Sequence, residues 1–363
     1  MSKKIFFIIN TLQGGGAERV VSTLARRLHE LDYQVSIVCL NAAQSVYPLP
    51  PDLKIIYLVD RKGDHPILRI YYATQLFLKL SYLLLTKRPD CTISFMTTAN
   101  LWTGFSSLFT QTRYIVSERT SPDQTIHLYG KLLQWVCGIV YGNAKATVVP
   151  SKGIEDCLKK NSNFKTLNNY KVIHNPITNQ ANFITPYKVS NYKFILAAGR
   201  LSYEKGFDLL IKAFKNADLP RNVRLLIVGQ GPEEGNLMRQ INIANLQDRV
   251  KLLGFKKDVY NYYSQAEFFV LSSRNEGYPN ALIEAMSMGC ACIAMDCQFG
   301  PSEIIENYQN GLLVKDGDVY ELSKAINLLF NDAELKGKLA RNAQLINKTN
   351  NLDHITSQWE AII

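Results

Sequence analysis

Short apolar segments alternate with helical segments along the whole chain, and this alternation constrains the fold more than any other feature. Such segments of strand length recur through both halves of the 363 residues. Strands that are buried on both faces read as short continuous apolar runs, with helices crossing over between them. The predicted strands span residues 4–9, 35–40, 55–59, 91–95, 114–116, 147–150, 193–198, 224–228, 250–253, 268–271, 291–294 and 311–314. We therefore predict an α/β protein with two doubly wound parallel sheets.

A polar, Asn-rich stretch without a core pattern follows Asn175 and separates the two series of strands. Domain boundaries commonly fall in such stretches. We predict an N-terminal domain over 1–178 that is completed by a C-terminal helix over 350–363, a linker over 179–192, and a C-terminal domain over 193–349. Ligands of doubly wound sheets bind at the carboxyl ends of the strands, so the expected site is the cleft between the two domains.

Two carboxylates, Glu276 and Glu284, follow the predicted strand 268–271 and stand eight positions apart. A turn-forming run, 277–280, lies between them and leads into a helical run, 281–286. A helix N-terminus presents free N–H groups and the positive end of the helix dipole, which suits a phosphate. The acids can then hold hydroxyl groups on either side of that phosphate. The pattern suggests a phosphorylated, polyhydroxylated ligand such as a nucleotide-sugar.

Two further loops at predicted strand ends suit the same ligand. Residues 14–16 are consecutive glycines, which let the backbone approach a ligand closely. They fit a dinucleotide-binding fingerprint poorly, because Arg19 occupies its last glycine or alanine position. Arg200 and Lys205 share the loop after strand 193–198, where two fixed cations can neutralise a diphosphate. A structural turn and a solvated loop, respectively, are the alternative interpretations.

These motifs together resemble those of a known family. In this order and spacing, residues 14–19, 199–206, 276–284 and 300–304 are similar to the motifs of family 4 retaining glycosyltransferases of the GT-B fold. The resemblance covers essentially the whole chain and is most specific in the C-terminal half. It implies two Rossmann-like domains that face each other across a cleft. It also implies that no cofactor and no metal is needed, because fixed cations and helix dipoles stabilise the leaving diphosphate.

The resemblance implies roles for individual residues. Arg200 and Lys205 would bind the donor diphosphate and Glu276 would contact hydroxyls of the donor sugar, so these three are the predicted catalytic residues. Glu284 would hold the ribose hydroxyls, and Phe255 would lie near the base. The complete set of predicted donor-binding residues is Gly15, Gly16, Gly231, Phe255, Gly277, Tyr278, Asn280, Ala281 and Glu284.

One position departs from the family pattern. Many relatives have a histidine near the acceptor, after a strand of the N-terminal domain, whereas Glu118 and Arg119 occupy that stretch here. We therefore expect no histidine-dependent handling of the acceptor. Glu118 and Arg119 become the candidate contacts for the acceptor or the donor sugar.

The basic character of the chain belongs to its first half. Residues 1–190 carry 22 Lys and Arg against 11 Asp and Glu, and the remaining residues carry 19 against 20. Such a half favours an anionic partner, either a membrane surface, a lipid phosphate or nucleic acid, and a merely solvated surface is the alternative. Residues 66–86 are apolar, but Arg69 and Lys79 interrupt them and argue against a spanning helix. This segment and residues 128–141 are predicted as either interfacial or core-facing helices.

The cysteine pattern bears on location. The seven cysteines are odd in number and irregularly spaced, which predicts buried thiols in a reducing compartment. The five histidines are scattered and give no metal cluster. Residues 5–9 form an apolar run of strand length only, so we expect no signal peptide. The predicted location is cytoplasmic, with peripheral attachment to the inner face of the cell membrane.

We therefore predict a retaining enzyme that moves a hexose or N-acetylhexosamine from a nucleotide-sugar, favoured as a UDP-sugar, to a hydroxyl of a lipid-linked polyprenyl diphosphate glycan. Assembly of bacterial O-antigen, lipopolysaccharide or capsule is the expected setting, without a nucleic-acid partner. A UDP-sugar 2-epimerase of the same fold and a non-catalytic binding module are the alternatives. The intact set of Arg200, Lys205, Glu276 and Glu284 argues against a purely structural role.

Overall fold

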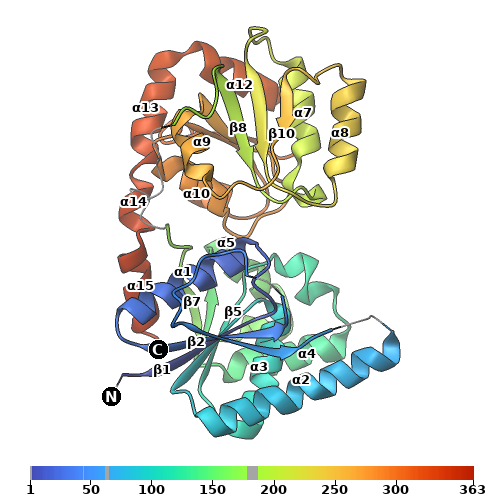
Figure 1. The fold of residues 1–363 in the computed structure, drawn as a ribbon, viewed down its shortest axis with the longest axis vertical. Helices are drawn as coiled ribbons and strands as arrows, with labels where there is room; N and C mark the ends of the chain where they lie inside the picture. The colour runs from blue at the N-terminus through green and yellow to red at the C-terminus, as the bar shows by residue number, and fades with distance from the viewer. Residues whose placement is uncertain (1, 44, 62–64, 178–186) are drawn as a thin grey trace. The chain divides into compact units, whose positions relative to one another are not determined.

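The computed structural model describes residues 2–43, 45–61, 65–177 and 187–363. The chain divides into two compact units (Figure 1). The first comprises Met1–Pro176 and Leu352–Ile363, and the second comprises Ile177–Asn351. Most of the linker expected at 179–192 lies outside the described residues, while 187–192 belong to the second unit.

In the described part of the first unit, seven parallel strands form one sheet in the order β3-β2-β1-β4-β5-β6-β7. They are β1 Lys4–Ile9, β2 Gln34–Asn41, β3 Lys54–Val59, β4 Cys91–Phe95, β5 Tyr114–Ser117, β6 Ala146–Val149 and β7 Tyr170–Val172. The six predicted strands are confirmed to within two residues at each end. The edge strand β7 was missed, because its three side chains are largely unburied and give no apolar run.

The helices of the first unit lie between these strands and at the end of the chain. They are α1 Gly16–Glu30, α2 Pro66–Lys87, α3 Thr97–Thr110, α4 Lys131–Asn143, α5 Lys152–Lys159, α6 Ser162–Lys165 and α15 Leu352–Glu360, with the 3₁₀ turns η1 Pro122–Gln124 and η2 Ile126–Leu128. The last helix, α15, lies beside α1 (Figure 1). Its Trp359 is buried and stacks on Phe95 at 5.7 Å between ring centroids, so the end of the chain belongs to the core of this unit.

In the described part of the second unit, six parallel strands follow the order β10-β9-β8-β11-β12-β13. They are β8 Phe194–Ala198, β9 Arg224–Val228, β10 Val250–Leu252, β11 Phe268–Leu271, β12 Cys292–Asp296 and β13 Leu312–Lys315. The helices are α7 Phe207–Asn216, α8 Glu234–Ile243, α9 Val259–Gln265, α10 Asn280–Ser287, α11 Pro301–Ile304, α12 Val319–Asn331, α13 Ala333–Ala343 and α14 Ile346–Thr349, with the 3₁₀ turn η3 Tyr203–Lys205. The predicted α/β class is confirmed, since each unit contains the doubly wound order of a Rossmann-like sheet.

The strand order positions the site within the second unit. The order reverses between β8 and β11, which are hydrogen-bonded neighbours although they are far apart in the sequence. Ligands of open α/β sheets bind beyond the carboxyl ends of the strands at such a reversal. The loops that follow β8 and β11, residues 199–206 and 272–279, leave the sheet at this point.

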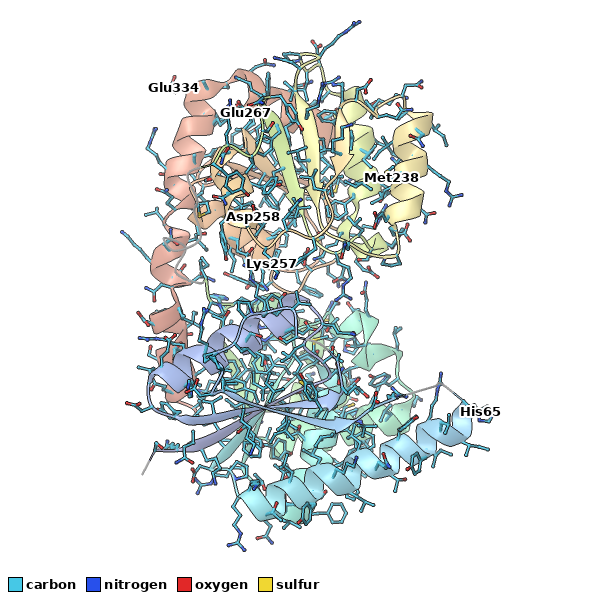
Figure 2. The ribbon with its side chains drawn as sticks, viewed as in Figure 1. His65, Met238, Lys257, Asp258, Glu267 and Glu334 are labelled. Atoms are coloured by element: carbon cyan, nitrogen blue, oxygen red, sulfur yellow. The ribbon has the colours of Figure 1, made fainter. Side chains whose placement is uncertain are left out.

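Helix α2 combines the two alternatives that its sequence left open. Leu76, Leu80 and Leu84 are buried at one-turn spacing and pack in the core of the first unit. Most of the other apolar side chains project into solvent from the helix, which begins after His65 (Figure 2). The exposed ones are Ile67, Leu68, Ile70, Tyr71, Leu78, Tyr82 and Leu85. Within the described residues, no helix has the length and apolarity needed to cross a membrane.

Candidate active site

Lys205 and Glu276 form an ion pair where the loops after β8 and β11 meet. The Nζ atom of Lys205 lies 2.6 Å from Oε1 of Glu276, although the residues are 71 positions apart in the chain. The Ser273 hydroxyl donates a second hydrogen bond to the same oxygen, also at 2.6 Å. Glu276 is only 8% exposed. A buried carboxylate that accepts short hydrogen bonds from an ammonium and a hydroxyl is held in one orientation. This suits a group that must recognise a ligand.

The loop that carries Lys205 is pressed against the end of β11. Gly206 has φ of 61°, and a Cβ at this position would lie 2.0 Å from the backbone oxygen of Ser272. The hydroxyl of Ser272 donates to the backbone oxygen of Lys205 at 3.1 Å. Glycine is therefore needed at position 206 both for its backbone conformation and for space. Arg200, the second residue of the same loop, is exposed.

Gly231, a predicted donor-binding residue, has a structural reason to be glycine. A Cβ there would lie 2.3 Å from the backbone oxygen of Leu201. The backbone N–H of Leu201 also donates to Gln230 at 2.9 Å, so the loops after β8 and β9 pack backbone against backbone. The contact of Gly231 with a donor stays a prediction. Phe255, after β10, exposes nearly half of its surface and is accessible for stacking on a base.

Helix α10 begins at Asn280, one residue before the predicted helical run. Asn280 and Ala281 are thus the first two residues of the helix, and backbone N–H groups at these positions point out of the helix N-terminus rather than into its i→i−4 hydrogen bonds. Glu284 lies one turn further on and is buried, and the hydroxyl of Tyr263 in α9 donates to its Oε2 at 3.4 Å. Tyr263 was not predicted as a site residue, because it stands in an aromatic run whose spacing is that of an ordinary core helix.

The side chain of Tyr278 is buried in the second unit rather than presented to a ligand. Its hydroxyl accepts a hydrogen bond from Nδ2 of Asn350 at 3.0 Å, and burial raises the pKa of the phenol. Any contact that Tyr278 makes with donor phosphates would therefore use its backbone atoms, and the predicted donor contacts of Gly277 and Tyr278 stay predictions.

In the first unit, Gly15 and Gly16 stand at the beginning of α1. Gly15 has an extended backbone, and both of its polar backbone groups meet the hydroxyl of Tyr47. Its N–H donates to that hydroxyl at 3.2 Å, and the hydroxyl donates to its carbonyl oxygen at 2.9 Å. Tyr47 therefore orients the glycine-rich loop, and nothing in the local sequence pattern indicates this role.

Glu118 is completely buried at the end of β5. Its carboxylate accepts hydrogen bonds from the hydroxyls of Tyr141 at 2.6 Å and Thr97 at 2.8 Å. The backbone N–H groups of Arg119 and Thr120 donate to its other oxygen. Burial raises the pKa of Glu118. A direct contact with an acceptor would require this network to open, so Glu118 orders the loop after β5 in the conformation described.

Arg119 lies against the C-terminal helix. Its guanidinium is 5.1 Å from the ring centroid of Phe95 and 5.8 Å from that of Trp359. Its Nε and Nη1 atoms donate to Ser117 and Asn175 at 2.8 and 2.7 Å. Burial lowers the pKa of Arg119 to about 9. The predicted contact of Arg119 with an acceptor stays a prediction.

One group of side chains with metal-ligating atoms was not expected from the scattered histidines. Asp123, His127 and Cys157 place one such atom each within 4.8 Å of one another in the first unit. Asp123 already links the other two, through a 2.7 Å bond with Nδ1 of His127 and a hydrogen bond with the thiol of Cys157. The group ties the turns η1 and η2 to α5 and belongs to the packing of that unit.

Comparison with known proteins gives the family. Residues 14–180 match the model of Glycosyltransferase Family 4, and residues 180–345 match that of Glycosyl transferases group 1. The chain is 29% identical over 341 residues to an N-acetylgalactosamine-N,N'-diacetylbacillosaminyl-diphospho-undecaprenol 4-alpha-N-acetylgalactosaminyltransferase of Campylobacter jejuni, covering 92% of each chain. It is 28% identical to the amylovoran biosynthesis glycosyltransferase AmsD of Erwinia amylovora, covering 100% of each.

Solved structures agree on the fold. The crystal structure of Anabaena HepE in complex with UDP-glucose matches with a TM-score of 0.81 at 18% identity, covering 99% of this chain and 98% of that one. The lipopolysaccharide outer core galactosyltransferase WaaB matches with a TM-score of 0.73, also at 18% identity, with the same coverage. With two Rossmann-like units of the GT-B fold and sequence matches along nearly its whole length, the chain belongs to glycosyltransferase family 4 and is a glycosyltransferase.

Proposed function

We propose that this enzyme transfers a hexose or N-acetylhexosamine from a UDP-sugar to a hydroxyl of a glycan carried on polyprenyl diphosphate. The observation that carries the proposal is the Lys205–Glu276 pair beside the start of α10, at the strand-order reversal of the second sheet. A cation and a carboxylate held there are the groups that a sugar diphosphate requires. The name of the Campylobacter relative specifies an undecaprenol-diphosphate acceptor, and HepE was crystallised with UDP-glucose, which supports both substrates.

The proposed reaction breaks the bond between the anomeric carbon and the diphosphate oxygen and forms one to the acceptor oxygen on the same face, with retention. The acceptor's proton passes to the departing phosphate oxygen. Arg200 and Lys205 stabilise the negative charge that grows on the diphosphate, Glu276 holds sugar hydroxyls, and Glu284 holds the ribose. Fixed cations and the α10 dipole supply the charge that a metal supplies in other transferases, so we propose that no metal is required.

A donor screen tests this function. Purified enzyme is supplied with a panel of UDP-sugars, with and without a polyprenyl diphosphate glycan, and release of UDP is measured. We expect release of UDP that depends on the acceptor and occurs with one donor. The new linkage, examined by NMR, should have the same anomeric configuration, axial or equatorial, as the donor. Conversion of a UDP-sugar to its 2-epimer without acceptor would identify an epimerase instead. Binding of UDP-sugars without any turnover would identify a non-catalytic module.

The same proposal puts the first unit against the anionic inner face of the cell membrane, in bacterial surface-polysaccharide assembly. Its support is the combination of exposed apolar and basic side chains. On α2, Ile67, Ile70 and Tyr82 are each at least 70% exposed, and on and before α4 the exposed apolar residues include Leu132 and Trp135. The first 190 residues also carry twice as many Lys and Arg as Asp and Glu. Interfacial helices bind membranes through this pairing of apolar and cationic groups.

Charged substitutions on α2 test the membrane proposal. We expect the double variant Ile70→Glu, Tyr82→Glu to lose at least about tenfold in affinity for phosphatidylglycerol vesicles at low salt, because two apolar groups no longer enter the interface. Co-sedimentation measures the affinity. The matched control is Ile243→Glu on α8 of the second unit, where Ile243 is 83% exposed. Unchanged vesicle binding by the double variant, or equal loss in the control, would contradict the proposal.

A further inference from the structure

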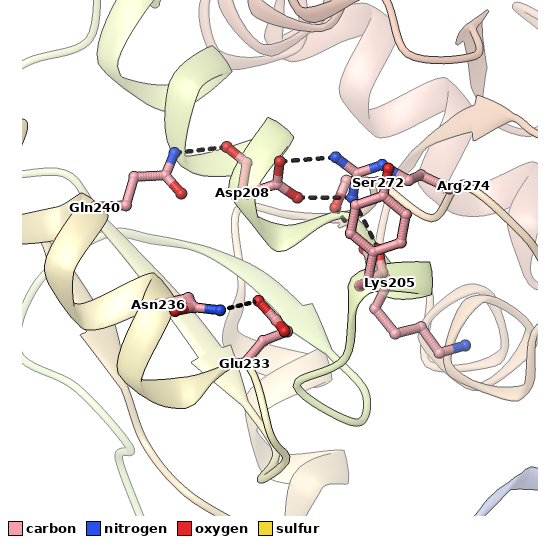
Figure 3. Close-up of polar contacts among 8 residues, drawn as sticks. Lys205, Asp208, Glu233, Asn236, Gln240, Ser272 and Arg274 are labelled. Atoms are coloured by element: carbon pink, nitrogen blue, oxygen red, sulfur yellow. Dashed lines mark hydrogen bonds and ion pairs between the residues drawn. The ribbon is translucent and has the colours of Figure 1, made fainter.

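The segment after β11, residues 272–276, contacts the η3 turn, Tyr203–Lys205, through every second residue. Ser272 donates to the backbone oxygen of Lys205 and Glu276 accepts from its Nζ atom, as described above. Between them, the guanidinium of Arg274 reaches the same turn (Figure 3). The backbone N–H of Arg274 contacts the turn as well. The first two contacts involve Lys205 itself, and those of Arg274 involve its neighbours.

Arg274 anchors the turn on both sides of Lys205. Its Nη1 donates to the backbone oxygen of Tyr203 at 2.8 Å, and its backbone N–H donates to the backbone oxygen of Glu204 at 2.8 Å. Its two terminal nitrogens donate to the two carboxylate oxygens of Asp208 at 2.7 Å each, as Figure 3 shows. Asp208 lies in the first turn of α7, immediately after the loop. The chain is thus fixed before and after Lys205 by one side chain.

The surroundings of the Arg274–Asp208 ion pair stabilise it. Both side chains are partly withdrawn from solvent. Burial by itself raises the pKa of Asp208, but the hydrogen bonds and charge of Arg274, together with the charge of Lys212 and a backbone hydrogen bond, hold that pKa below its usual range. The ring of Tyr203 covers the guanidinium, with 4.1 Å from Cζ to the ring centroid. A planar guanidinium makes all of these contacts together, and a lysine ammonium does not.

We propose that Arg274, braced by Asp208, is a positioning residue that presents Lys205 to the donor diphosphate. The inference rests on the proposed role of Lys205 in transferase chemistry and adds a residue that does not itself touch the substrate. A preorganised cation stabilises developing charge without rearranging at the moment of reaction. A displacement of about 1 Å in such a group can cost on the order of 10²-fold in rate. Freeing the turn therefore lowers kcat through Lys205.

A double-mutant cycle in the donor assay separates positioning from stability. We expect Arg274→Gln to lower kcat about 10- to 100-fold in the otherwise native enzyme, with a smaller change in the KM for the donor. In a Lys205→Ala background the same substitution should change kcat less than about threefold, because the group that it positions is gone. Asp208→Asn, which breaks the pair from its other side, should reproduce the loss, and Arg274→Lys should not restore the rate. Additive losses in the cycle would overturn the proposal.

Arg249 offers a matched control in the same unit. Its guanidinium lies 4.9 Å from the ring centroid of Phe214 and donates to backbone oxygens of Val223 and Pro220, but it touches nothing in the η3 turn. Arg249→Gln should lower Tm while leaving kcat unchanged. If Arg249→Gln lowers kcat as much as Arg274→Gln does, the role of Arg274 is structural and the proposal fails.

A second measurement does not depend on turnover. Hydrogen–deuterium exchange at residues 203–206 should accelerate in Arg274→Gln and stay native in Arg249→Gln, since only the first frees the turn. Native exchange there in Arg274→Gln would overturn the proposal even if the enzyme is active. Absence of any transferase activity in the native enzyme would instead contradict the proposed function, while the exchange result would still decide whether Arg274 orders the turn.

Discussion

Replacing Lys205 with alanine is expected to lower kcat by about 10²- to 10³-fold, the loss typical of removing one preorganised charge-stabilising group. Lys205 Nζ lies 2.6 Å from Glu276, so its position is set before the donor arrives. Because the charge on the diphosphate increases as the sugar leaves, the cation contributes most in the transition state. The KM for the nucleotide-sugar should therefore change much less than kcat.

Steady-state kinetics over a range of donor concentrations measure both constants for this variant. Lys205→Arg should recover part of the rate, since the charge remains but the geometry differs. Lys215→Ala, on the exposed side of α7, is the matched control and should behave like the native enzyme. A kcat for Lys205→Ala within twofold of native, with native circular dichroism, would remove Lys205 from the mechanism.

Replacing Glu276 with glutamine is expected to lower kcat/KM by about 10²-fold. The change keeps the size of the side chain and its capacity to accept from Ser273, but it removes the carboxylate charge. A hydrogen bond to a charged group contributes about 1.5–3 kcal/mol, and the partly buried Lys205 partner loses its counter-charge as well. Both effects fall on the donor site.

Binding of two ligands distinguishes these effects. If Glu276 contacts the sugar, calorimetry should show native affinity of Glu276→Gln for UDP and weakened affinity for the UDP-sugar. The control is Glu267→Gln, labelled in Figure 2, which disrupts an ion pair with Lys336 in the same unit. It should lower Tm and leave donor affinity native. Equal weakening of UDP and UDP-sugar binding by Glu276→Gln would contradict a sugar contact.

The strands of both sheets were predictable because their signal is local. A strand buried on both faces needs an apolar residue at nearly every position, as β1 and β8 show. Such a strand is therefore recognisable in the sequence as a continuous apolar run. Edge strand β7 lacks that burial and was missed. The seven cysteines are buried and unpaired in the structure, as their irregular spacing predicted.

Helix α2 shows where a local pattern is insufficient. Its sequence is apolar on more than one face, so periodicity could not decide between a core helix and an interfacial one. The structure buries Leu76, Leu80 and Leu84 and leaves other large apolar residues exposed. Only the packing of α2 against its own sheet and α3 reveals which residues fall on each face.

The candidate site was predictable as a set of residues but not as an arrangement. Loops at strand ends, consecutive glycines and a helix start carry their chemistry in short motifs, so Lys205, Glu276 and Glu284 could be named from the sequence alone. Their partners could not. Tyr263 donates to Glu284, and Arg274 holds the turn that contains Lys205. In each case the two partners lie tens of residues apart in the sequence.

The sequence by itself determined two doubly wound α/β units and the motifs at their strand ends, because burial and turn formation act on neighbouring residues. Only the tertiary structure decided that Lys205 and Glu276 pair and that Glu118 lies buried in a hydrogen-bond network. The physical reason is the strand order. Because β8 pairs with β11, the loops after these two strands become neighbours, and no spacing along the chain records that contact.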